Sequence, residues 1–269
     1  MATLLYLIAW AAFFVLYGWL LDAFVLGWRA GLLVLALVGS FATAFAGLLL
    51  FLWVYALIRR NKDPFNPTDH RVVVSVMRLL IRLLRLRVDV SGLEKTPEGP
   101  FVLVSNHQTL YDILVLKAQF KNRRVVFIAK EEIFSWPVIG RWTRLLGNIP
   151  ITRMADRSAA KAILEGIKAY EQGVPVIIFP EGERSHSPKM RSFRSGAFKL
   201  AMRPKADILV ASLRGVHRTW RGWPFVSQNV QIRFGPLLKP ADYQGMNSAE
   251  LSEQVREIIR PHAEEHSEG

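Results

Sequence analysis

A histidine and an aspartate stand five residues apart directly after an apolar run of the chain. The run covers residues 101–105 (FVLVS), and His107 and Asp112 follow it. On one regular helix their side chains would point roughly 140° apart, so we expect His107 in a turn and Asp112 in the first turn of the next helix. Asp112 can then accept a hydrogen bond from one ring nitrogen, and the other nitrogen is free to take a proton from a substrate hydroxyl.

Two further motifs carry arginines. The motif FPEGERS, residues 179–185, also follows an apolar run. Its Gly182 lets the backbone approach a ligand closely, and Arg184 offers a planar set of donors to phosphate or carboxylate. The motif GNIPITR, residues 147–153, ends at Arg153. Taken singly, each motif also has a simpler interpretation: ordinary polar residues at strand ends, with Arg184 pairing a neighbouring glutamate.

In this order the three motifs resemble those of the glycerophospholipid acyltransferase family, whose type member acylates 1-acyl-glycerol-3-phosphate to phosphatidate. The family's first motif is Asn-His, four residues, then Asp, and residues 106–112 (NHQTLYD) match it. FPEGERS departs from the family's FPEGTRS at Glu183, and Arg153 matches the arginine that ends the second motif.

The resemblance covers about residues 85–235. Residues 130–142 (KEEIFSWPVIGRW) resemble the family's lead-in to the second motif, where the family more often has Phe in place of Pro150. A fourth family motif normally has a proline after an aliphatic strand, and residues 208–215 (ILVASLRG) lack it. This difference concerns the acyl side of the substrate pocket.

The resemblance implies a role for each matched residue. His107 would be the general base, Asp112 its orienting partner, and the acceptor's polar head would be bound by Arg153, Glu181, Gly182 and Arg184. The donor would be acyl-CoA or an acyl-carrier protein, with no further cofactor and no metal. Since the alcohol attacks an activated thioester, proton removal and oxyanion stabilisation are sufficient. Backbone N–H groups at the helix start after His107 are one candidate for the oxyanion site.

Short β-branched runs alternate with helical stretches after residue 92, which is typical of α/β proteins. We therefore expect a mixed central sheet flanked by helices. The predicted strands are 101–105, 125–129, 175–179, 208–213 and 229–234. The predicted helices are 109–120, 137–146, 157–172, 195–203 and 248–260, the last with a capping-box start at Asn247 and Glu250.

Two uncharged runs precede this part, residues 1–21 and 31–58. Because about 20 apolar residues suffice to cross a bilayer as a helix, they predict a membrane-associated two-helix hairpin that either spans the bilayer or enters one leaflet. A cleaved signal peptide is disfavoured, since the first basic residue is Arg29. A stripe of small residues would let the helices approach closely, and Tyr and Trp side chains could anchor them at the interface. The stripe is Gly39, Thr43 and Gly47; the anchors are Tyr17, Trp19, Trp28, Trp53 and Tyr55.

The net charge of +13 lies entirely in residues 59–269, because residues 1–58 contain one acid and one base. Arg59, Arg60 and Lys62 follow the second run and predict a cytoplasmic catalytic domain. We divide the chain into a membrane hairpin (1–58), a basic amphipathic connector (59–86) and an acyltransferase catalytic domain (87–269). In the connector, Arg78, Arg82 and Arg85 share one face, so it is either an interfacial helix on acidic lipid or a surface helix packed on the core.

The partners expected are a lysolipid acceptor, an acyl-CoA or acidic acyl-carrier protein and an anionic membrane surface, without nucleic acid. Two alternatives stay open: acylation of another lysolipid, such as lyso-ornithine lipid or a lysophospholipid, and a non-catalytic membrane-tethered basic binding protein. The chain has no cysteine and no G-x-S-x-G stretch, which excludes a thiolate nucleophile and disfavours a serine hydrolase. Residues 262–266 (HAEEH) fit a zinc spacing weakly, and their place in a polar tail favours solvated residues.

Overall fold

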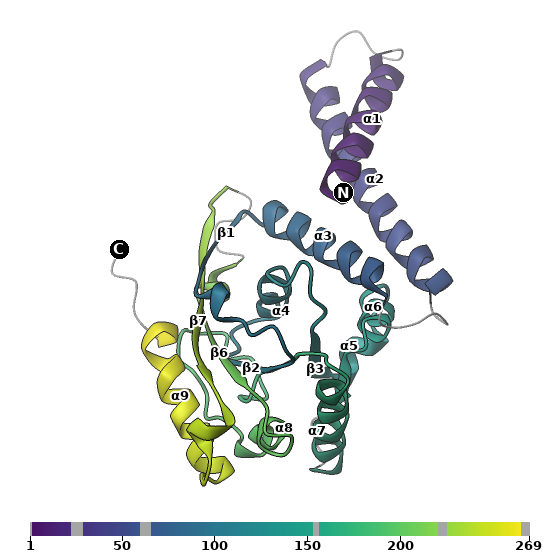
Figure 1. The fold of residues 1–269 in the computed structure, drawn as a ribbon. Helices are drawn as coiled ribbons and strands as arrows, with labels where there is room; N and C mark the ends of the chain where they lie inside the picture. The colour runs from purple at the N-terminus through teal and green to yellow at the C-terminus, as the bar shows by residue number, and fades with distance from the viewer. Residues whose placement is uncertain (1, 23–28, 60–65, 153–155, 220–224, 265–269) are drawn as a thin grey trace.

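A computed structural model describes residues 2–22, 29–59, 66–152, 156–219 and 225–264. A pair of long helices projects away from a body built on one sheet, and a third helix lies between the pair and the sheet (Figure 1). This arrangement confirms the predicted fold class of a mixed sheet flanked by helices and preceded by a helical hairpin.

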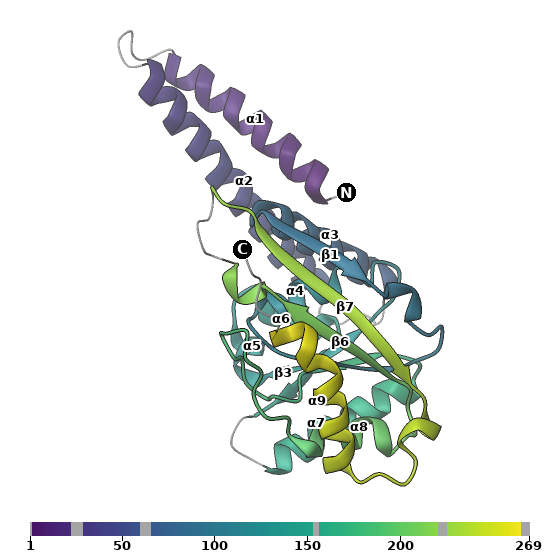
Figure 2. The ribbon, with the colours of Figure 1, turned by 90° about the vertical axis from the view of Figure 1, so that its left-hand side faces the viewer.

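The hairpin consists of α1 (Ala2–Asp22) and α2 (Arg29–Arg59), which run side by side (Figure 2). Both are long and apolar enough to cross a membrane, and most of their side chains face outward. The small-residue stripe contacts α1 at two of its three positions. Tyr17 shares a 3.1 Å hydrogen bond with Thr43, and a Cβ on Gly39 would touch the Tyr17 ring, whereas a Cβ on Gly47 would meet no atom within 4 Å. Trp28 lies outside the described residues.

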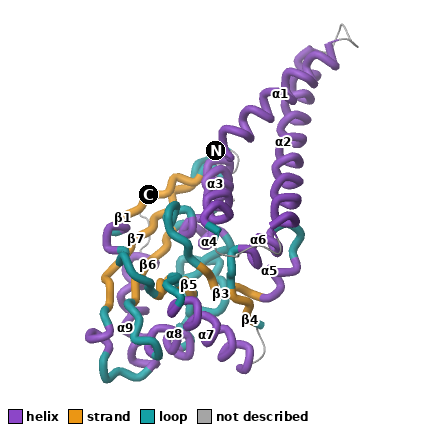
Figure 3. Tube along the Cα trace, turned by 45° about the vertical axis from the view of Figure 1, so that its right-hand side comes forward, coloured by secondary structure: helices purple, strands orange, loops and turns teal. Residues whose placement is uncertain are grey.

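The C-terminal part of α2 reaches down to the body beside α6 (Ile139–Leu145; Figure 3). The indole of Trp142 donates a 3.0 Å hydrogen bond to the carbonyl of Leu52 and stacks on Tyr55 with 5.3 Å between ring centroids. The hairpin is therefore joined to the body by specific packing as well as by the chain.

Helix α3 (Pro67–Leu83) covers most of the predicted connector. Asn66 caps it by accepting a hydrogen bond from the backbone N–H of Thr68. Met77, Leu80 and Ile81 pack against the sheet's core, and the Arg78 guanidinium donates to the carbonyl of Ala118 in the helix beneath. The amphipathic pattern thus produces a helix packed on the core. Arg60 and Lys62 lie outside the described residues.

Asp69 fastens α3 to the end of α2. Its carboxylate is 1% exposed, accepts a hydrogen bond from Tyr55 Oη at 2.7 Å and pairs with the Arg59 guanidinium at 3.0 Å. The cation and the hydroxyl compensate the cost of burying this charge.

Replacing Asp69 with alanine should weaken the attachment of the hairpin to the body. The change removes the carboxylate that pairs with Arg59 and accepts from Tyr55, and removing one partner of a buried ion pair typically costs about 3 kcal/mol or more. For a chain of this size we expect a fall in Tm on the order of 6 °C, measured by thermal unfolding of the full chain in detergent. Replacing the exposed Glu94 with alanine serves as the control; equal Tm values for the two variants would contradict the assignment.

Within the described residues, seven strands form one sheet in the order β1-β7-β6-β2-β5-β3-β4. All neighbouring pairs are parallel except β6 with β7, so the sheet is mixed. The strands are β1 (Leu86–Ser91), β2 (Val102–Ser105), β3 (Val126–Lys130), β4 (Ile149–Ile151), β5 (Val176–Ile178), β6 (Ile208–Arg214) and β7 (Gln228–Leu238).

Two of these strands were not predicted, and both lie at the edges of the sheet. β1 is amphipathic, and its alternation is hidden by the adjoining helical pattern of α3. β4 is three residues long and contains Pro150, which is tolerated on an edge strand because the outer side needs no ladder hydrogen bond. Neither strand has the continuous apolar run that marks the central strands.

Alternate residues of the central strands face opposite layers of helices. Val102 and Val104 of β2 join a core with α7, α8 and α9, whereas Phe101 and Leu103 join a core with α3 and α4. The body's helices are α4 (Tyr111–Lys117), α5 (Glu131–Ser135), α6 (Ile139–Leu145), α7 (Asp156–Glu171), α8 (Lys199–Met202) and α9 (Ser248–Glu264). Short 3-10 turns occupy Leu93–Lys95, Ser195–Phe198, Val216–Arg218 and Pro240–Tyr243.

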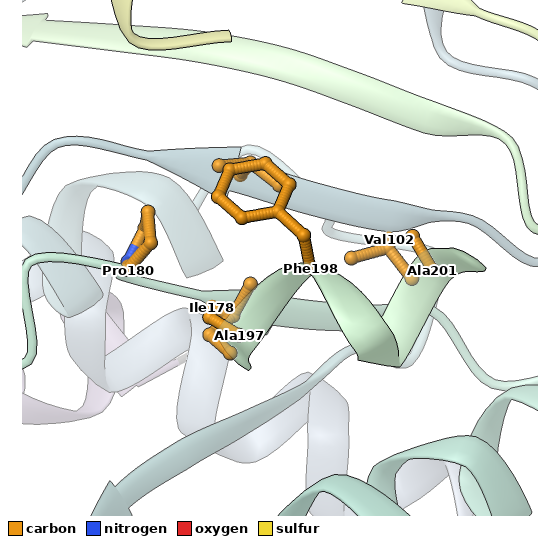
Figure 4. Close-up of a pocket in the computed structure, with 7 residues that line it drawn as sticks. Val102, Ile178, Pro180, Ala197, Phe198 and Ala201 are labelled. Carbon is orange, nitrogen blue, oxygen red and sulfur yellow. The ribbon is translucent and has the colours of Figure 1, made fainter. Parts of the chain in front are cut away.

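The predicted helix 195–203 is a 3-10 turn (η2, Ser195–Phe198) that continues into α8. Its inner side packs tightly on the sheet: Phe198 and Ala201 lie against Val102 of β2 and Ile178 of β5 (Figure 4), and these side chains leave no room for a water molecule. The predicted capping box of the last helix is confirmed, since Asn247 Oδ1 accepts from the N–H of Glu250 and Glu250 accepts from the N–H of Asn247.

Candidate active site

His107 and Asp112 meet at the carboxyl end of β2. The strand ends at Ser105, residues 106–110 form a turn, and α4 begins at Tyr111, so His107 lies in the turn and Asp112 in the first turn of the helix. His107 Nδ1 donates to Asp112 Oδ2 over 2.7 Å. The hydrogen bond expected from the five-residue spacing is present, and it assigns the Nδ1–H tautomer, which leaves Nε2 as the basic nitrogen.

Asp112 is completely buried, and its Oδ2 also accepts the backbone N–H groups of Gln108 and Thr109, at 2.5 and 2.9 Å. Burial raises the pKa of Asp112, while the hydrogen bonds from His107 and the two amides oppose that rise. These donors hold the carboxylate in one orientation, and the carboxylate in turn holds the imidazole.

The same amides were the candidates for stabilising an oxyanion, and that expectation is wrong for Gln108 and Thr109. Both N–H groups point at the Asp112 carboxylate because a buried charge needs donors close to it. The N–H of His107 itself is also engaged, by Glu181.

The imidazole of His107 lies flat against Phe179, with 4.3 Å between ring centroids and 16° between ring planes. Phe179 in turn stacks near Phe127. In the part of the chain that the structure describes, Nε2 of His107 has no hydrogen-bond partner, and the side chain lines the cavity described below. The ring is therefore held on one side by Asp112 and on one face by Phe179, with its basic nitrogen left for a substrate.

Glu181 connects the two motifs rather than presenting a free carboxylate. Its Oε1 accepts the N–H of His107 at 2.7 Å and its Oε2 accepts the N–H of Arg191 at 2.8 Å. The side chain is 4% exposed and does not line the cavity, which differs from the expectation that Glu181 binds the acceptor. Burial raises the pKa of Glu181 to about 7, opposed by its two backbone donors.

Backbone hydrogen bonds complete the connection between the loops. The N–H of Ser185 donates to the carbonyl of His107 at 2.8 Å, and the N–H of His186 donates to the carbonyl of Gln108 at 3.0 Å. The loop after β5 is thereby held against the loop after β2. This contact places the arginine of one motif beside the histidine of the other.

A cavity of about 820 Å³ opens at these loops. His107, Gly182 and Arg184 all line it, so the structure brings three of the predicted site residues together. Arg153 lies outside the described residues; Ile151 and Thr152, which precede it, line the cavity. Most of the remaining wall is apolar and comes from β3, β5 and the helices α4, α5 and α7.

Gly182 is required by its backbone conformation and its surroundings. Its φ is +69°, in the region that favours glycine, and a Cβ there would lie 2.7 Å from Nε of Arg194. Arg184 has no carboxylate partner among the described residues; the neighbouring Glu183 pairs instead with Arg191 at 3.2 Å. The simpler interpretation, in which Arg184 pairs with an adjacent glutamate, is therefore not what the structure shows.

Sequence analysis missed four cations that line the same cavity: Lys130, Arg194, Lys199 and Arg203. Trp136, which like Lys130 belongs to the lead-in of the second motif, also lines the cavity. Two of these cations could have been predicted from the sequence, because Lys199 and Arg203 stand four residues apart and enclose the apolar pair Leu200 and Ala201. That pattern indicates a helix with one buried side and one cationic side.

The fourth motif, residues 208–215, does not line the cavity. Its strand β6 neighbours β2, and its Leu213 exchanges two hydrogen bonds with the side chain of Asn106, at 2.7 and 2.9 Å. The side chain of Gln108 similarly accepts the N–H of Val216 at 3.0 Å. These contacts hold the turn that carries His107 from the side opposite β5.

His262 shares a 2.8 Å hydrogen bond with Ser212, which ties α9 to β6. His266, the other histidine of the weak zinc spacing, lies outside the described residues. Among the described residues, no group of three His, Asp or Glu side chains is arranged to hold a metal ion.

Residues 87–214 match the family model described as Acyltransferase. The chain is 31% identical over 199 residues to a 1-acyl-sn-glycerol-3-phosphate acyltransferase of Pseudomonas aeruginosa, covering 71% of this chain and 76% of that protein. It is 30% identical over 218 residues to the alpha enzyme of that name in Homo sapiens, covering 78% and 75%.

A chloroplastic relative from Arabidopsis thaliana with the same enzyme name is 31% identical over 155 residues, which are 57% of this chain and 43% of that protein. The chain thus spans less than half the length of that relative. The crystal structure of the 1-acyl-sn-glycerophosphate acyltransferase of Thermotoga maritima superimposes with a TM-score of 0.65 at 24% identity, over 80% of this chain and 88% of that one. The two chains share a fold.

Proposed function

Because the chain belongs to the acyltransferase family, we propose that it transfers a fatty acyl group from a thioester donor to the free hydroxyl of 1-acyl-glycerol-3-phosphate and forms phosphatidate. The observation that carries the proposal is that His107, whose Nε2 has no hydrogen-bond partner among the described residues, lines the same cavity as Arg184, which has no carboxylate partner among them. A base for a hydroxyl and a cation for a phosphate are the two groups that this acceptor requires.

The reaction follows from the geometry of His107. Nε2 takes the proton of the acceptor hydroxyl while the oxygen attacks the thioester carbonyl carbon. The new C–O bond gives a tetrahedral intermediate, the C–S bond breaks, and the thiolate takes the proton from Nε2. Asp112, already bonded to Nδ1, stabilises the imidazolium that forms between these steps.

The acceptor's phosphate is bound by Arg184, and by Arg153 as the resemblance implies. Arg184 can present two parallel N–H donors to phosphate oxygens. Glu181 is a positioning residue in this scheme, since both of its oxygens are occupied by backbone N–H groups. The apolar wall of the cavity offers Ile113, Ile133 and Ile163 to an acyl chain.

The acceptor is a lipid, and α1 and α2 supply the means to reach it. Both helices have the length and composition to enter a bilayer, and the packing of α2 on α6 keeps the body next to them. The acidic inner leaflet suits the basic body, and the run of Arg59, Arg60 and Lys62 directly after the second apolar segment supports a cytoplasmic position for the body.

The decisive experiment supplies the full chain, in detergent or lipid, with a panel of lysolipids and with both acyl-CoA and acyl-carrier protein. The product lipid is identified by mass. Phosphatidate formed preferentially from 1-acyl-glycerol-3-phosphate supports the proposal. Preferential acylation of another lysolipid would contradict the proposed acceptor. Salt-dependent binding of anions without transfer from either thioester would contradict the proposal that the chain is an enzyme.

The raised pKa of Glu181 predicts that kcat/KM depends on pH near neutrality. Both carboxylate oxygens accept N–H groups, and a proton on either oxygen would face one of those donors, so the arrangement needs the ionised form. With the pKa raised to about 7, Glu181 is ionised above pH 7 and protonated below it. We expect kcat/KM to fall as the pH drops through about 7, in part because Glu181 loses one of these hydrogen bonds.

Glu181→Gln tests this dependence, because the amide presents N–H hydrogens at every pH. We expect kcat/KM at pH 8 to be about tenfold lower than in the wild type, the loss of roughly one hydrogen bond, and the acid limb of the pH profile to lose one ionisation. Glu165→Gln, which alters a side chain of α7 that is 44% exposed, is the control. A Glu181→Gln profile that overlays the wild type would rule out this role.

A further inference from the structure

Two cations line the cavity on the side formed by α8. Lys199 and Arg203 are four residues apart, about one turn of the chain, and both contribute to the wall of the cavity that holds His107. Neither forms an ion pair with a carboxylate among the described residues. The intervening Leu200 and Ala201 are buried, and Ala201 packs on the sheet beside Phe198 (Figure 4), whereas Lys199 and Arg203 are exposed.

The charge of the cavity exceeds what one acceptor phosphate needs. Five cations line it, and Glu132 is the one carboxylate among its described lining residues; the cations are Lys130, Arg184, Arg194, Lys199 and Arg203. A concave surface with this imbalance attracts anions and concentrates them. Arg184 lies in the loop that is hydrogen-bonded to the turn carrying His107. Lys199 and Arg203 are therefore available to a second anionic group.

The position of Lys199 and Arg203 matches the reach of a thioester donor. From Arg194, which packs over Gly182 beside the catalytic loop, the chain runs through one 3-10 turn and then α8 to Arg203. Rises of about 2.0 and 1.5 Å per residue give a path of roughly 10 Å to Lys199 and roughly 16 Å to Arg203. A pantetheine arm, similar to four or five residues of extended chain, separates its sulfur from its phosphate by roughly 15 Å.

We propose that Lys199 and Arg203 bind the phosphate groups of the acyl donor, at the end of the pantetheine arm distant from the thioester. This inference rests on the proposed function and assigns the donor to one side of the cavity. His107 and Arg184 then serve the acceptor, and α8 serves the donor. The phosphate of phosphopantetheine is common to CoA and to a carrier protein, so both donors can engage the pair.

The test compares the full chain with a variant carrying Lys199→Ala and Arg203→Ala. The donors are acyl-CoA, acyl-carrier protein and the acyl thioester of N-acetylcysteamine, which has the same thioester but no phosphate. We expect the KM for acyl-CoA to rise about tenfold, since two exposed charge-assisted contacts are lost. The KM for the N-acetylcysteamine thioester, the KM for the lysolipid and kcat should stay within about twofold.

Arg157→Ala with Lys161→Ala is a matched control. This pair has the same charges and the same four-residue spacing, lies on α7 at the border of the cavity, is exposed and does not line it. We expect its kinetics to equal those of the wild type with every donor. If the Lys199→Ala and Arg203→Ala variant raises the KM for only one of acyl-CoA and acyl-carrier protein, that donor is the one whose phosphate the pair binds.

Two results would overturn the inference while leaving the proposed function intact: an unchanged KM for both phosphate-bearing donors, or an equal rise for the N-acetylcysteamine thioester. Failure of the wild type to transfer an acyl group to any lysolipid would instead overturn the proposed function. A second variant with Lys199→Glu and Arg203→Glu should raise the KM for acyl-CoA further, because it repels the phosphates, and this rise should weaken as salt is added.

Discussion

Replacing His107 with alanine is expected to lower kcat for acyl transfer by about 10² to 10⁴, the usual contribution of a positioned general base. The KM for the lysolipid should change little, since the alanine removes the group that acts on the hydroxyl proton and leaves Arg184 in place. The measurement is the initial rate of phosphatidate formation by the purified full chain, with the product identified by mass.

Asp112→Asn removes the negative charge beside the imidazole of His107 and leaves the imidazole itself in place. The asparagine oxygen can still accept the two backbone N–H groups, but it carries no charge to stabilise an imidazolium. We expect a loss of activity of the same order as for His107→Ala, and a double variant no worse than either single one, because the two residues act as a unit. Near wild-type turnover by His107→Ala would disprove the assigned mechanism, whatever the behaviour of Asp112→Asn.

The second large effect is expected from Arg184→Ala, which removes the cation placed beside the base. Loss of a bidentate, charge-assisted contact with a phosphate should raise the KM for 1-acyl-glycerol-3-phosphate by about 100-fold. Arg184→Lys keeps the charge but loses the planar pair of donors, so its KM should lie between the KM values of the wild type and of Arg184→Ala. The measurement is steady-state kinetics with the acceptor varied at saturating donor.

Two controls make the Arg184 experiment specific. Arg191→Ala changes an exposed arginine that pairs with Glu183 and keeps the backbone N–H that Glu181 needs. Monoacylglycerol, an acceptor without phosphate, tests the ligand: its KM should not respond to Arg184→Ala. An equal loss for both acceptors would mean that Arg184 maintains the loop and does not bind phosphate.

Much of the fold could be predicted because its signals are local. The central strands are continuous apolar runs, the long N-terminal helices are uncharged runs, and Asn247 with Glu250 marks a helix start; each pattern spans a few residues and survives in the folded chain. The errors fall at the edges. β1 and β4 are edge strands whose pairing depends on β7 and β3, and a short stretch of sequence carries little trace of such partners.

The position of His107 in a turn could also be predicted from neighbouring residues. Five helical steps cannot bring it to Asp112, so a turn must begin the motif, and the structure has that turn. The surroundings of the pair were not local. Glu181 is 74 residues from His107, and Leu213 is 107 residues from Asn106, yet these contacts decide which amides are free and which carboxylates are occupied.

Residue types and short spacings therefore established the two apolar helices, the α/β body and the hydrogen-bonded pair of His107 and Asp112, because helix and strand periods and a turn are properties of neighbouring residues. The folded chain decided that Glu181 holds backbone N–H groups, that the amides after His107 serve Asp112, and that Lys199 and Arg203 share a cavity with the base. The physical reason is that buried polar groups take the nearest partner in space, and nearness in space is set by the order of strands in the sheet.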